Sequence, residues 1–419
     1  MAPLPHKLKG KDYSGLFWAV LTILFVFSMV RDPQGIFHSA QKGIQAWWNI
    51  VFPALLPFFI ASDLLTKLGI VRFLGTLLHP IMRPLFNLPG DASFVMAIGY
   101  TSGYPIGSSL TAQLRSQGQI TRLEGERLMA FTNNASPLFM LCAVAIGMFH
   151  NPSLGILIAL AHYLANLTIG ILLRFYGRQD PERIPQATHR YSLLRQALNE
   201  MMQYQRQNYQ PLGSMLNEAV TKSIQQLLTI GGFIIIFSVI ISILEQAGFL
   251  HLLSKIIALG TIPLGFSEAV NEGLAWGFFE ITLGVKKISE TQAPLWQQAM
   301  AISLILAWCG ISVQAQVASM ISKTDLRMGL FICCRGAHAV LSSLFCWLLS
   351  PQYLTASQDL TSTVLSWNIA NNPSWWNQLK FYTFTSGLDI ALLLSLALIL
   401  ALISGTQCFW LWIRPKRIR

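Results

Sequence analysis

Charged side chains are scarce in this chain: of 419 residues only 11% are Asp, Glu, Lys or Arg, whereas 53% are hydrophobic. A soluble domain carries about 25% charged residues, so the composition excludes an ordinary soluble protein. Uncharged stretches such as 152–173 and 224–244 reach the roughly 20 residues that a helix needs to cross the hydrocarbon of a bilayer. The sequence therefore predicts a protein that crosses a membrane several times.

Motifs for cofactor, metal and nucleotide chemistry are also missing. There is no HExxH, no phosphate-binding P-loop and no convincing dinucleotide fingerprint, and none of the six cysteines has CxxC spacing. The segment 99–103, taken with His162, bears a weak likeness to an intramembrane serine hydrolase, but its serine is displaced by one residue from the G-x-S-G pattern. We therefore expect no metal, no cofactor and no enzyme activity.

The basic residues are distributed beside apolar segments. The net charge is +11, but no basic stretch is interleaved with aromatics as a nucleic-acid surface would be, so we expect no nucleic-acid partner. Lysines and arginines lie at both termini and in 177–222, whereas 351–379 has none. Because cytoplasmic loops carry the excess of Lys and Arg, this places both termini and 177–222 in the cytoplasm and 351–379 outside.

Two interrupted apolar units follow one another with matched spacing. Two glycines are separated by 30 residues in the first unit and 29 in the second, and a polar tract follows 35 residues later in both. The matched positions are Gly69 and Gly248, Gly99 and Gly277, and Asn134 and Ser312. A repeat with broken apolar segments at corresponding places indicates a transporter whose binding site lies between the repeats.

We predict an all-α polytopic membrane protein with eight spans and two re-entrant hairpins. The predicted spans are 14–31, 45–67, 120–149, 152–174, 223–246, 293–321, 328–350 and 382–405, and the hairpins are 91–117 and 265–290. Residues 70–88 suit an interfacial helix. The charge bias orients 45–67 and 223–246 in opposite directions, which makes the repeat inverted. The predicted divisions are 1–44, 45–176, 177–222 as a cytoplasmic linker, 223–350 and 351–419.

Polar clusters at repeat-equivalent places are the candidate substrate site. Unpaired polar groups are costly in lipid, so such clusters face a cavity or another helix, and simple helix–helix ties are the alternative reading. The candidates are Thr101, Ser102, Gly103 and Tyr104 at the first hairpin tip, Thr132, Asn133, Asn134 and Ser136, Glu280 and Thr282 at the second tip, and Ser312, Gln314 and Arg335.

Three ionisable groups leave alternatives open. Glu280 is the carboxylate near a hairpin tip, and it either binds a proton or cation or contacts backbone amides. Arg335 lies within the span 328–350, where it either extends to the inner surface or binds an anionic substrate. His162 and His338 occupy equivalent positions, and we expect them to donate interhelical hydrogen bonds rather than to relay protons.

These segments also carry a family resemblance. Residues 102–107, 131–139 and 277–284, with 52–59 and 149–155, resemble the YlbJ (SpoVV) family of sporulation integral membrane proteins over roughly 45–350. Such proteins contain two nucleoside-recognition (Gate) domains and are similar in plan to concentrative nucleoside transporters. The resemblance implies transport of dipicolinic acid out of the mother cell across the outer forespore membrane. A nucleoside or other metabolite permease, or a non-transporting sporulation scaffold, remains an alternative.

Overall fold

The structure, a computed structural model, describes residues 10–177 and 193–370, and every regular element in these ranges is a helix. The all-α prediction is confirmed. Five segments there are long and apolar enough to cross a membrane: Pro33–Lys67, Pro152–Leu173, Leu212–Gln246, Leu295–Ile321 and Met328–Ser350. The total of eight spans stays a prediction. The predicted span 382–405 lies outside the described residues, and the predicted spans 14–31 and 120–149 hold only shorter apolar helices, Ala19–Arg31 and Phe139–Met148.

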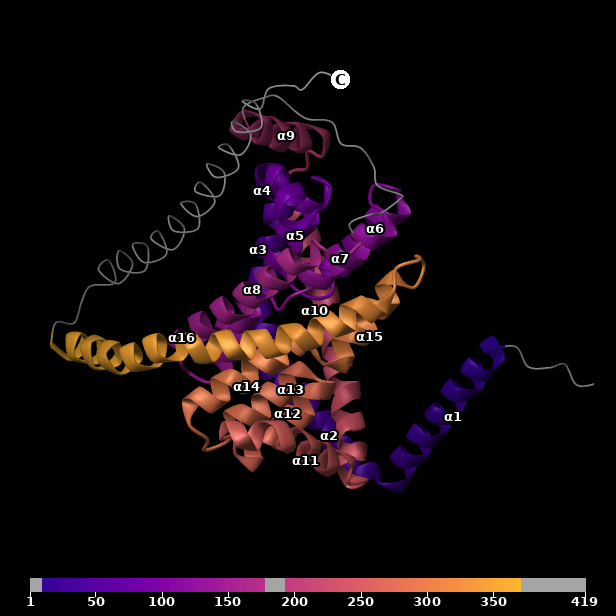
Figure 1. Ribbon diagram of the computed structural model, residues 1–419, viewed down its shortest axis with the longest axis vertical. Coiled ribbons are helices and arrows are strands. Elements are labelled where there is room, and N and C mark those ends of the chain that lie inside the picture. Colours follow the sequence, from indigo (N-terminus) through magenta and orange to yellow (C-terminus); the bar gives the residue numbers. More distant parts are fainter. Residues whose placement is uncertain (1–9, 178–192, 371–419) are drawn as a thin grey trace, which may run out of the picture.

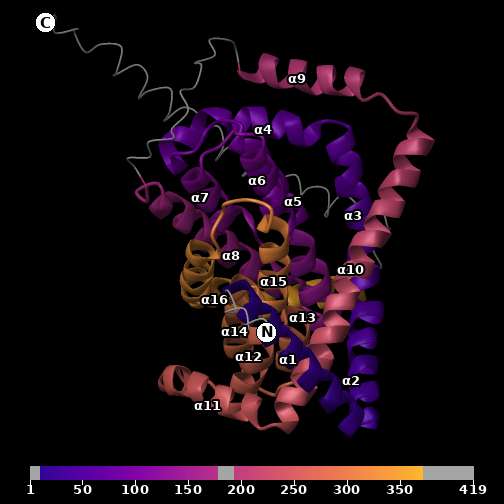
Figure 2. The ribbon, with the colours of Figure 1, turned by 90° about the vertical axis from the view of Figure 1, so that its right-hand side faces the viewer.

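A pair of long rods forms one edge of the molecule (Figure 2). The first rod is built from α2 (Pro33–Ala46), η1 (Trp47–Val51) and α3 (Phe52–Lys67), and the second is α10 (Leu212–Gln246). The indole Nε1 of Trp47 donates to the carbonyl of Leu227 at 2.9 Å, which ties the rods near their middle. We call these two rods the scaffold pair.

Both rods begin earlier than the sequence analysis predicts. The predicted starts at residues 45 and 223 are wrong, since the helices begin at Pro33 and Leu212. Asp32 caps the first by accepting from the amide of Gly35 at 3.0 Å, and Pro33 suits the first helical turn because its missing N–H needs no partner there. Pro211 precedes the second helix. The segment predicted as a linker therefore holds the start of α10 as well as α9 (Leu193–Gln207).

Two short helices leave the scaffold pair at opposite ends (Figure 2). They are α4 (Ile70–Ile81), which continues into η2 (Met82–Phe86), and α11 (Phe249–Thr261), which continues into η4 (Ile262–Leu264). Each follows a glycine in the left-handed region, Gly69 with φ 76° and Gly248 with φ 75°. Glycine reaches this conformation without steric cost, so both rods turn sharply at the same kind of residue.

The two predicted hairpins are present as helical hairpins. The first is α5 (Ala92–Ser102) and α6 (Ile106–Ser116), and the second is α12 (Glu268–Phe279) and α13 (Ile281–Ser289). Each is joined by a short non-helical tip, at residues 103–105 and at Glu280. Neither tip is at the surface of the molecule, because Gly103 and Glu280 are buried.

In each half of the chain, the hairpin is followed first by an interrupted helix and then by a continuous helix. The interrupted helices are α7 (Arg122–Thr132) with η3 (Phe139–Met148), and α14 (Leu295–Trp308) with α15 (Gly310–Ile321). The continuous helices are α8 (Pro152–Leu173) and α16 (Met328–Ala370). Buried side chains from both halves, such as Val144, Leu157, Val285 and Ile302, form one apolar core between them.

The long helix α16 continues into the segment 351–379, whose external location stays a prediction. Its backbone is helical as far as Ala370, beyond the predicted end of the span at residue 350 (Figure 1). The stretch 351–370 contains no glycine, and Pro351 at its start is its one proline. The rest of the stretch therefore has no helix-breaking residue. The helix α1 (Gly10–Arg31) extends away from the body of the molecule in Figure 1.

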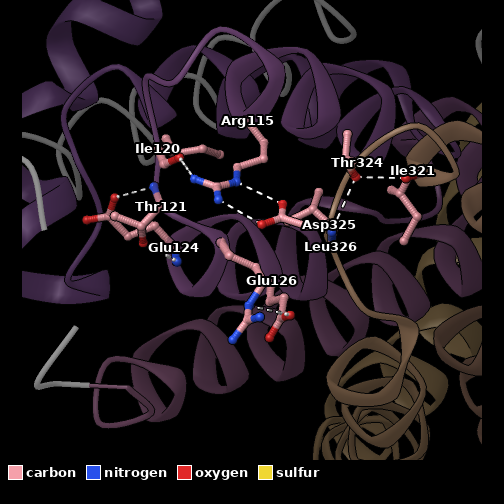
Figure 3. A network of polar contacts seen from close by, with 10 residues as sticks. Arg115, Ile120, Thr121, Glu124, Glu126, Ile321, Thr324, Asp325 and Leu326 are labelled. Carbon is pink, nitrogen blue, oxygen red and sulfur yellow. Dashed lines mark hydrogen bonds and ion pairs between the residues drawn. The ribbon is translucent and has the colours of Figure 1, made fainter. Parts of the chain in front are cut away.

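An ion-pair network joins the end of the first hairpin to the loop before α16 (Figure 3). The guanidinium of Arg115 donates from Nε and Nη2 to the two carboxylate oxygens of Asp325, at 2.9 and 2.7 Å. Its Nη1 donates to the carbonyl of Ile120 at 3.1 Å. Beside it, Thr121 and Glu124 form a capping box that starts α7. The network fixes the end of α6 to both halves of the chain.

Candidate functional site

The first interrupted helix opens at residues 133–136. Asn133 is the C-terminal cap of α7, and the chain becomes helical again only at Pro137. The open backbone is partly satisfied: the amide of Ala135 donates to Nε2 of His162 at 3.3 Å, and the Ser136 hydroxyl accepts from the amide of Phe139 at 3.1 Å. Pro137 lacks an N–H and so cannot continue the α7 ladder.

Arg335 of α16 is bound to this opening. It is fully buried, and it donates to the carbonyl of Asn133 at 2.9 Å, to that of Ala130, and to Oδ1 of Asn166 at 3.2 Å. The last carbonyls of a helix carry partial negative charge and lack helical hydrogen-bond donors. A buried guanidinium there balances that charge and donates to those carbonyls. Of the two roles that the sequence analysis left open for Arg335, extension to the inner surface is contradicted by this burial.

The tip of the first hairpin packs around the end of α7. A Cβ atom at Gly99 or at Gly107 would overlap the carbonyl oxygen of Thr132, and one at Gly103 would overlap Ser136. Gly103 also has φ 80°, which disfavours other residues. These three glycines allow the hairpin backbone to approach the opened helix without intervening side chains.

The second half has a comparable arrangement with different chemistry. Glu280 is extended between α12 and α13, and its Oε2 accepts from the amide of Leu283 at 2.7 Å, which caps α13. The sequence analysis left this amide contact open as one of two roles, and the structure contains it. The second interrupted helix breaks at Cys309 and Gly310, both in the left-handed region with φ 67° and 64°. Gly310 lies against the carbonyl of Phe279.

The two tips and the two breaks meet at one cavity of about 80 Å³. Its wall includes the apolar side chains Leu55, Phe59 and Phe233 from the scaffold pair. The polar part of the wall comes from both halves and consists of Ser102, Gly103, Tyr104, Ser136, Glu280, Thr282, Ser312 and Gln316.

The starts of α13 and α15 lie in this wall, but Glu280 already caps α13. The start of α15 has no side-chain cap, and N–H groups at such an end favour negative or polar ligands.

A larger vestibule of about 710 Å³ adjoins the cavity. Ser102, Phe59 and Gln316 line both spaces, so the two share part of their wall. Ser62 on α3 lies 3.2 Å from Ser102, hydroxyl oxygen to hydroxyl oxygen, in this part of the molecule. The vestibule lies between the scaffold pair and the elements α5, α6 and α15, and its polar wall includes Gln225, Gln226, Thr229 and Ser319.

A charged cluster stands where Asp63 and Lys222 line the vestibule. Lys222 donates to Asp63 at 2.7 Å, and Lys67 lies 3.6 Å from the same carboxyl group and also pairs with Glu218. The cluster contains two cations and two anions, so it adds no net charge to the entrance. The only other formal charge in the walls of the two spaces is that of Glu280.

Comparison with known proteins agrees with this arrangement. The profile of the nucleoside-recognition (Gate) family matches residues 49–167 and 227–324, ranges that hold both hairpins and both helix breaks. The sporulation integral membrane protein YlbJ of Bacillus subtilis (strain 168) is 43% identical over 349 residues, which are 82% of this chain and 85% of that protein. The chain belongs to the YlbJ family of Gate-domain membrane proteins.

A second relative is more distant. An uncharacterized protein of Alkalihalophilus pseudofirmus is 28% identical over 146 residues, which are 33% of this chain and 31% of that protein. No solved structure matches the chain.

Seven of the thirteen predicted site residues line the cavity of this YlbJ-family protein. They are Ser102, Gly103, Tyr104, Ser136, Glu280, Thr282 and Ser312. The remaining six are near the tips or breaks, but the structure does not place them in the wall of either the cavity or the vestibule.

Those six residues make other contacts. The hydroxyl of Thr101 donates to the carbonyl of Ala97 at 2.9 Å, and that of Thr132 to Leu128 at 2.7 Å. Gln314 donates to the carbonyl of Trp308 at 3.3 Å and Asn134 to that of Phe131 at 3.1 Å. The remaining two are Arg335, described above, and Asn133, whose amide is buried with no hydrogen-bond partner on either atom.

The sequence analysis missed the contribution of the scaffold pair. Ser62, Gln226 and Thr229 lie on helices that looked like ordinary spans, and their polarity was not weighed. A signal was present, since Ser62 and Asp63 interrupt an apolar stretch one helical turn before Lys67. The repeat symmetry alone could not reveal them, because they lie on the scaffold pair and not on the hairpins or the interrupted helices.

The two histidines lie together behind the first break. Their ring centroids are 4.5 Å apart, and both are fully buried. Nε2 of His338 donates to the carbonyl of His162 at 2.9 Å, as expected for an interhelical donor, whereas Nε2 of His162 accepts from the amide of Ala135. Among the described residues no group of three or more His, Cys, Asp or Glu side chains is arranged for a metal ion.

Proposed function

We propose that this protein is a secondary transporter whose substrate binds where the two hairpin tips meet the two helix breaks. The observation that carries the proposal is the convergence of polar groups from both halves on one cavity beside a larger vestibule. Broken helices around a buried polar site are typical of transporters, because open backbone is tolerated inside a membrane only where it faces protein or water.

Alternating access supplies the transport step in this proposal. The second half repeats the element order of the first, and the basic flanks favour an inverted relation between them. Lys222 lines the vestibule and belongs to the side that the charge bias assigns to the cytoplasm. The structure then represents the state open to the cytoplasm, and the hairpins would expose the same cavity to the other side in the alternative state.

We propose dipicolinate as the substrate, carried from the mother cell across the outer forespore membrane. The support is membership of the YlbJ family, whose Bacillus subtilis relative is a sporulation membrane protein. The chemical support is the uncapped start of α15 and the hydroxyl groups in the cavity wall, which suit a small planar anion. Glu280 is assigned to hairpin closure or coupling, because its carboxylate would repel an anion in direct contact.

One observation favours a second candidate, a neutral nucleoside. Glu280 lines the cavity while Arg335 does not, so the wall of the cavity holds a formal anion and no formal cation. A neutral polar ligand with hydroxyl groups would avoid the repulsion that a dianion meets and could donate to Glu280. The two candidates therefore differ in the charge that the cavity accepts.

Ligand-dependent thermal stabilisation of the purified protein separates the candidates. A ligand at 100 times its Kd stabilises a folded protein by about 2.7 kcal/mol, so binding raises Tm by a measurable amount. We expect dipicolinate to raise Tm and uridine or adenosine to leave it unchanged. Stabilisation by nucleosides instead would favour the second candidate, and stabilisation by neither would favour a non-transporting scaffold.

A matched pair of variants tests the position of the site. Ser102 lines the cavity and the vestibule, whereas the adjacent Thr101 bonds to its own helix and lines neither. We expect Ser102→Ala to lower dipicolinate accumulation in spores several-fold and Thr101→Ala to have no such effect, with both proteins present in the membrane at normal levels. Equal accumulation in the two variants would contradict the placement.

A further inference from the structure

The helix α11 presents two different stripes outside the transport site. Leu252, Ile256 and Leu259 form an exposed apolar stripe, with Leu259 80% exposed. The neighbouring stripe carries His251 and Lys255. In a membrane protein such a helix lies along the interface, with its apolar stripe among acyl chains and its polar stripe at headgroup level.

A cleft of about 450 Å³ lies beside the polar stripe, between α11 and α12. Lys255 lines it from α11, and Glu268 lines it from the start of α12. No ion pair is found for either side chain among the described residues. Asn271 lies in the cleft wall with 1% of its surface exposed; its Oδ1 accepts from Thr261 at 2.6 Å, and its Nδ2 has no hydrogen-bond partner.

The opposite end of the molecule shows what a cleft of this kind binds. There α9 covers the polar cleft between α4 and α5, and the carboxylate of Glu200 accepts from the hydroxyl of Thr76 at 2.6 Å. Thr76 lies seven residues after Gly69, and Lys255 lies seven residues after Gly248. The carboxylate of Glu200 on α9 thus lies beside Thr76. The residue of α11 at the position that corresponds to Thr76 is Lys255, for which no ion pair is found among the described residues.

In the described chain α11 has no such cover. It packs against α10, α12 and η4, and Figure 2 shows no further helix beyond it at that end of the molecule. Lys255 and Glu268 therefore face an open space next to an apolar stripe, and the buried Asn271 belongs to the same cleft wall. Burying Nδ2 of Asn271 without an acceptor costs free energy that a bound acceptor would recover.

We propose that the α11–α12 cleft binds the headgroup of a zwitterionic aminophospholipid of the phosphatidylethanolamine type. The phosphate pairs with Lys255, the ammonium pairs with Glu268, and Nδ2 of Asn271 donates to a phosphate or ester oxygen. The acyl chains lie along Leu252, Ile256 and Leu259. Purely anionic lipids fit less well, because Glu268 and Glu272 both line the cleft, although Glu272 is partly neutralised by Lys287 at 3.5 Å.

The test is lipid binding to the full-length protein in detergent, measured by native mass spectrometry and by Tm. The probes are short-chain phosphatidylethanolamine, phosphatidylglycerol and phosphatidylcholine, and free phosphoethanolamine. The variants are Lys255→Ala and Glu268→Gln, two exposed positions whose substitution leaves the core intact. Lys323→Ala is the matched control, since it removes an exposed lysine from the loop before α16.

We expect phosphatidylethanolamine to bind best and each cleft variant to weaken it about tenfold, as for loss of one charged hydrogen bond. Lys323→Ala should bind like the parent. Phosphatidylcholine should bind more weakly because its quaternary ammonium has no N–H, and free phosphoethanolamine because it has no acyl chains. Unchanged affinity in both cleft variants, or a preference for phosphatidylglycerol, would overturn the proposal.

Discussion

Arg335 of α16 donates a hydrogen bond of 2.9 Å to the main-chain carbonyl of Asn133, the residue at which α7 stops being helical. The two residues are 202 positions apart in sequence, so this bond joins the second half of the chain to the break in the first. A buried guanidinium is thereby used to hold open backbone in place, and the consequences of removing it can be measured.

Substitution of Arg335 by methionine should destabilise the protein as well as abolish transport. The carbonyls of Ala130 and Asn133 would lose their donor in a buried place, at a cost of roughly 1–3 kcal/mol for each group left unpaired. We expect Tm in detergent to fall by several degrees. Arg327→Met, in the exposed loop before α16, is the control. A variant that lost transport but kept the parental Tm would indicate direct substrate contact instead.

Glutamine and alanine at position 280 should have separable effects. The amide oxygen of Gln can still accept from the Leu283 amide, whereas Ala removes the helix cap, which typically costs about 0.5–2 kcal/mol. We therefore expect Glu280→Ala to lower Tm and Glu280→Gln to leave it close to the parental value. Transport should be altered in both, because both remove the charge from the cavity wall. Full transport by Glu280→Gln would show that the carboxylate serves only as a cap.

Cysteine labelling should reveal the vestibule as water-filled and open to the cytoplasm. In a cysteine-free background, Gln226→Cys lies in the vestibule wall, whereas Leu228→Cys lies on the exposed apolar side of the same helix. A charged maleimide applied to inverted membrane vesicles should modify the first and spare the second. Modification of Gln226→Cys only from the external side would contradict the predicted orientation.

The ion pair between Arg115 and Asp325 predicts a small, pH-dependent contribution to stability. Hydrogen bonds from Arg115 lower the pKa of Asp325 below its ordinary value, so the pair stabilises the fold at neutral pH and is lost as the pH falls through that lowered pKa. Because the Asp325 side chain is 49% exposed, the effect should be about 0.2–1 kcal/mol.

A double-mutant cycle checks this ion pair. Asp325→Asn and Arg115→Met should each lower Tm slightly at pH 7, and the double variant should fall less than their sum. The difference between the parent and Asp325→Asn should vanish in strongly acidic buffer. Strict additivity at pH 7 would mean that the two side chains do not interact measurably.

The sequence predicted the hairpins well because their signals are local, since Gly103 and Pro105 cannot stay within a regular helix. The breaks at 133–136 and 309–310 were not predicted, because 120–149 and 293–321 were taken as continuous spans with polar tracts. Helix ends governed by weaker signals were missed, such as the start of α10 at Leu212. The inverted orientation of the repeat and the eight crossings stay predictions.

Which candidate residues line the cavity and which bond only to the backbone could not be predicted from sequence. Thr101 and Ser102 are adjacent and chemically alike, but helix geometry turns one toward its own backbone and the other toward the cavity. Arg335 was a candidate for substrate contact because an isolated cation in a span looks functional. Only the fold shows that the end of α7 stands opposite it, since the two lie more than 200 residues apart.

The bond from Arg335 also makes the two halves of the protein non-interchangeable. In the register that pairs His162 with His338, the first-half counterpart of Arg335 is Ala159, a side chain with no donor. A dimer assembled from two copies of the first half would retain the hairpin and the break but would have no guanidinium to hold the carbonyls of Ala130 and Asn133. The first half of the chain therefore supplies the opening at residues 133–136, and the second half supplies the residue that holds it.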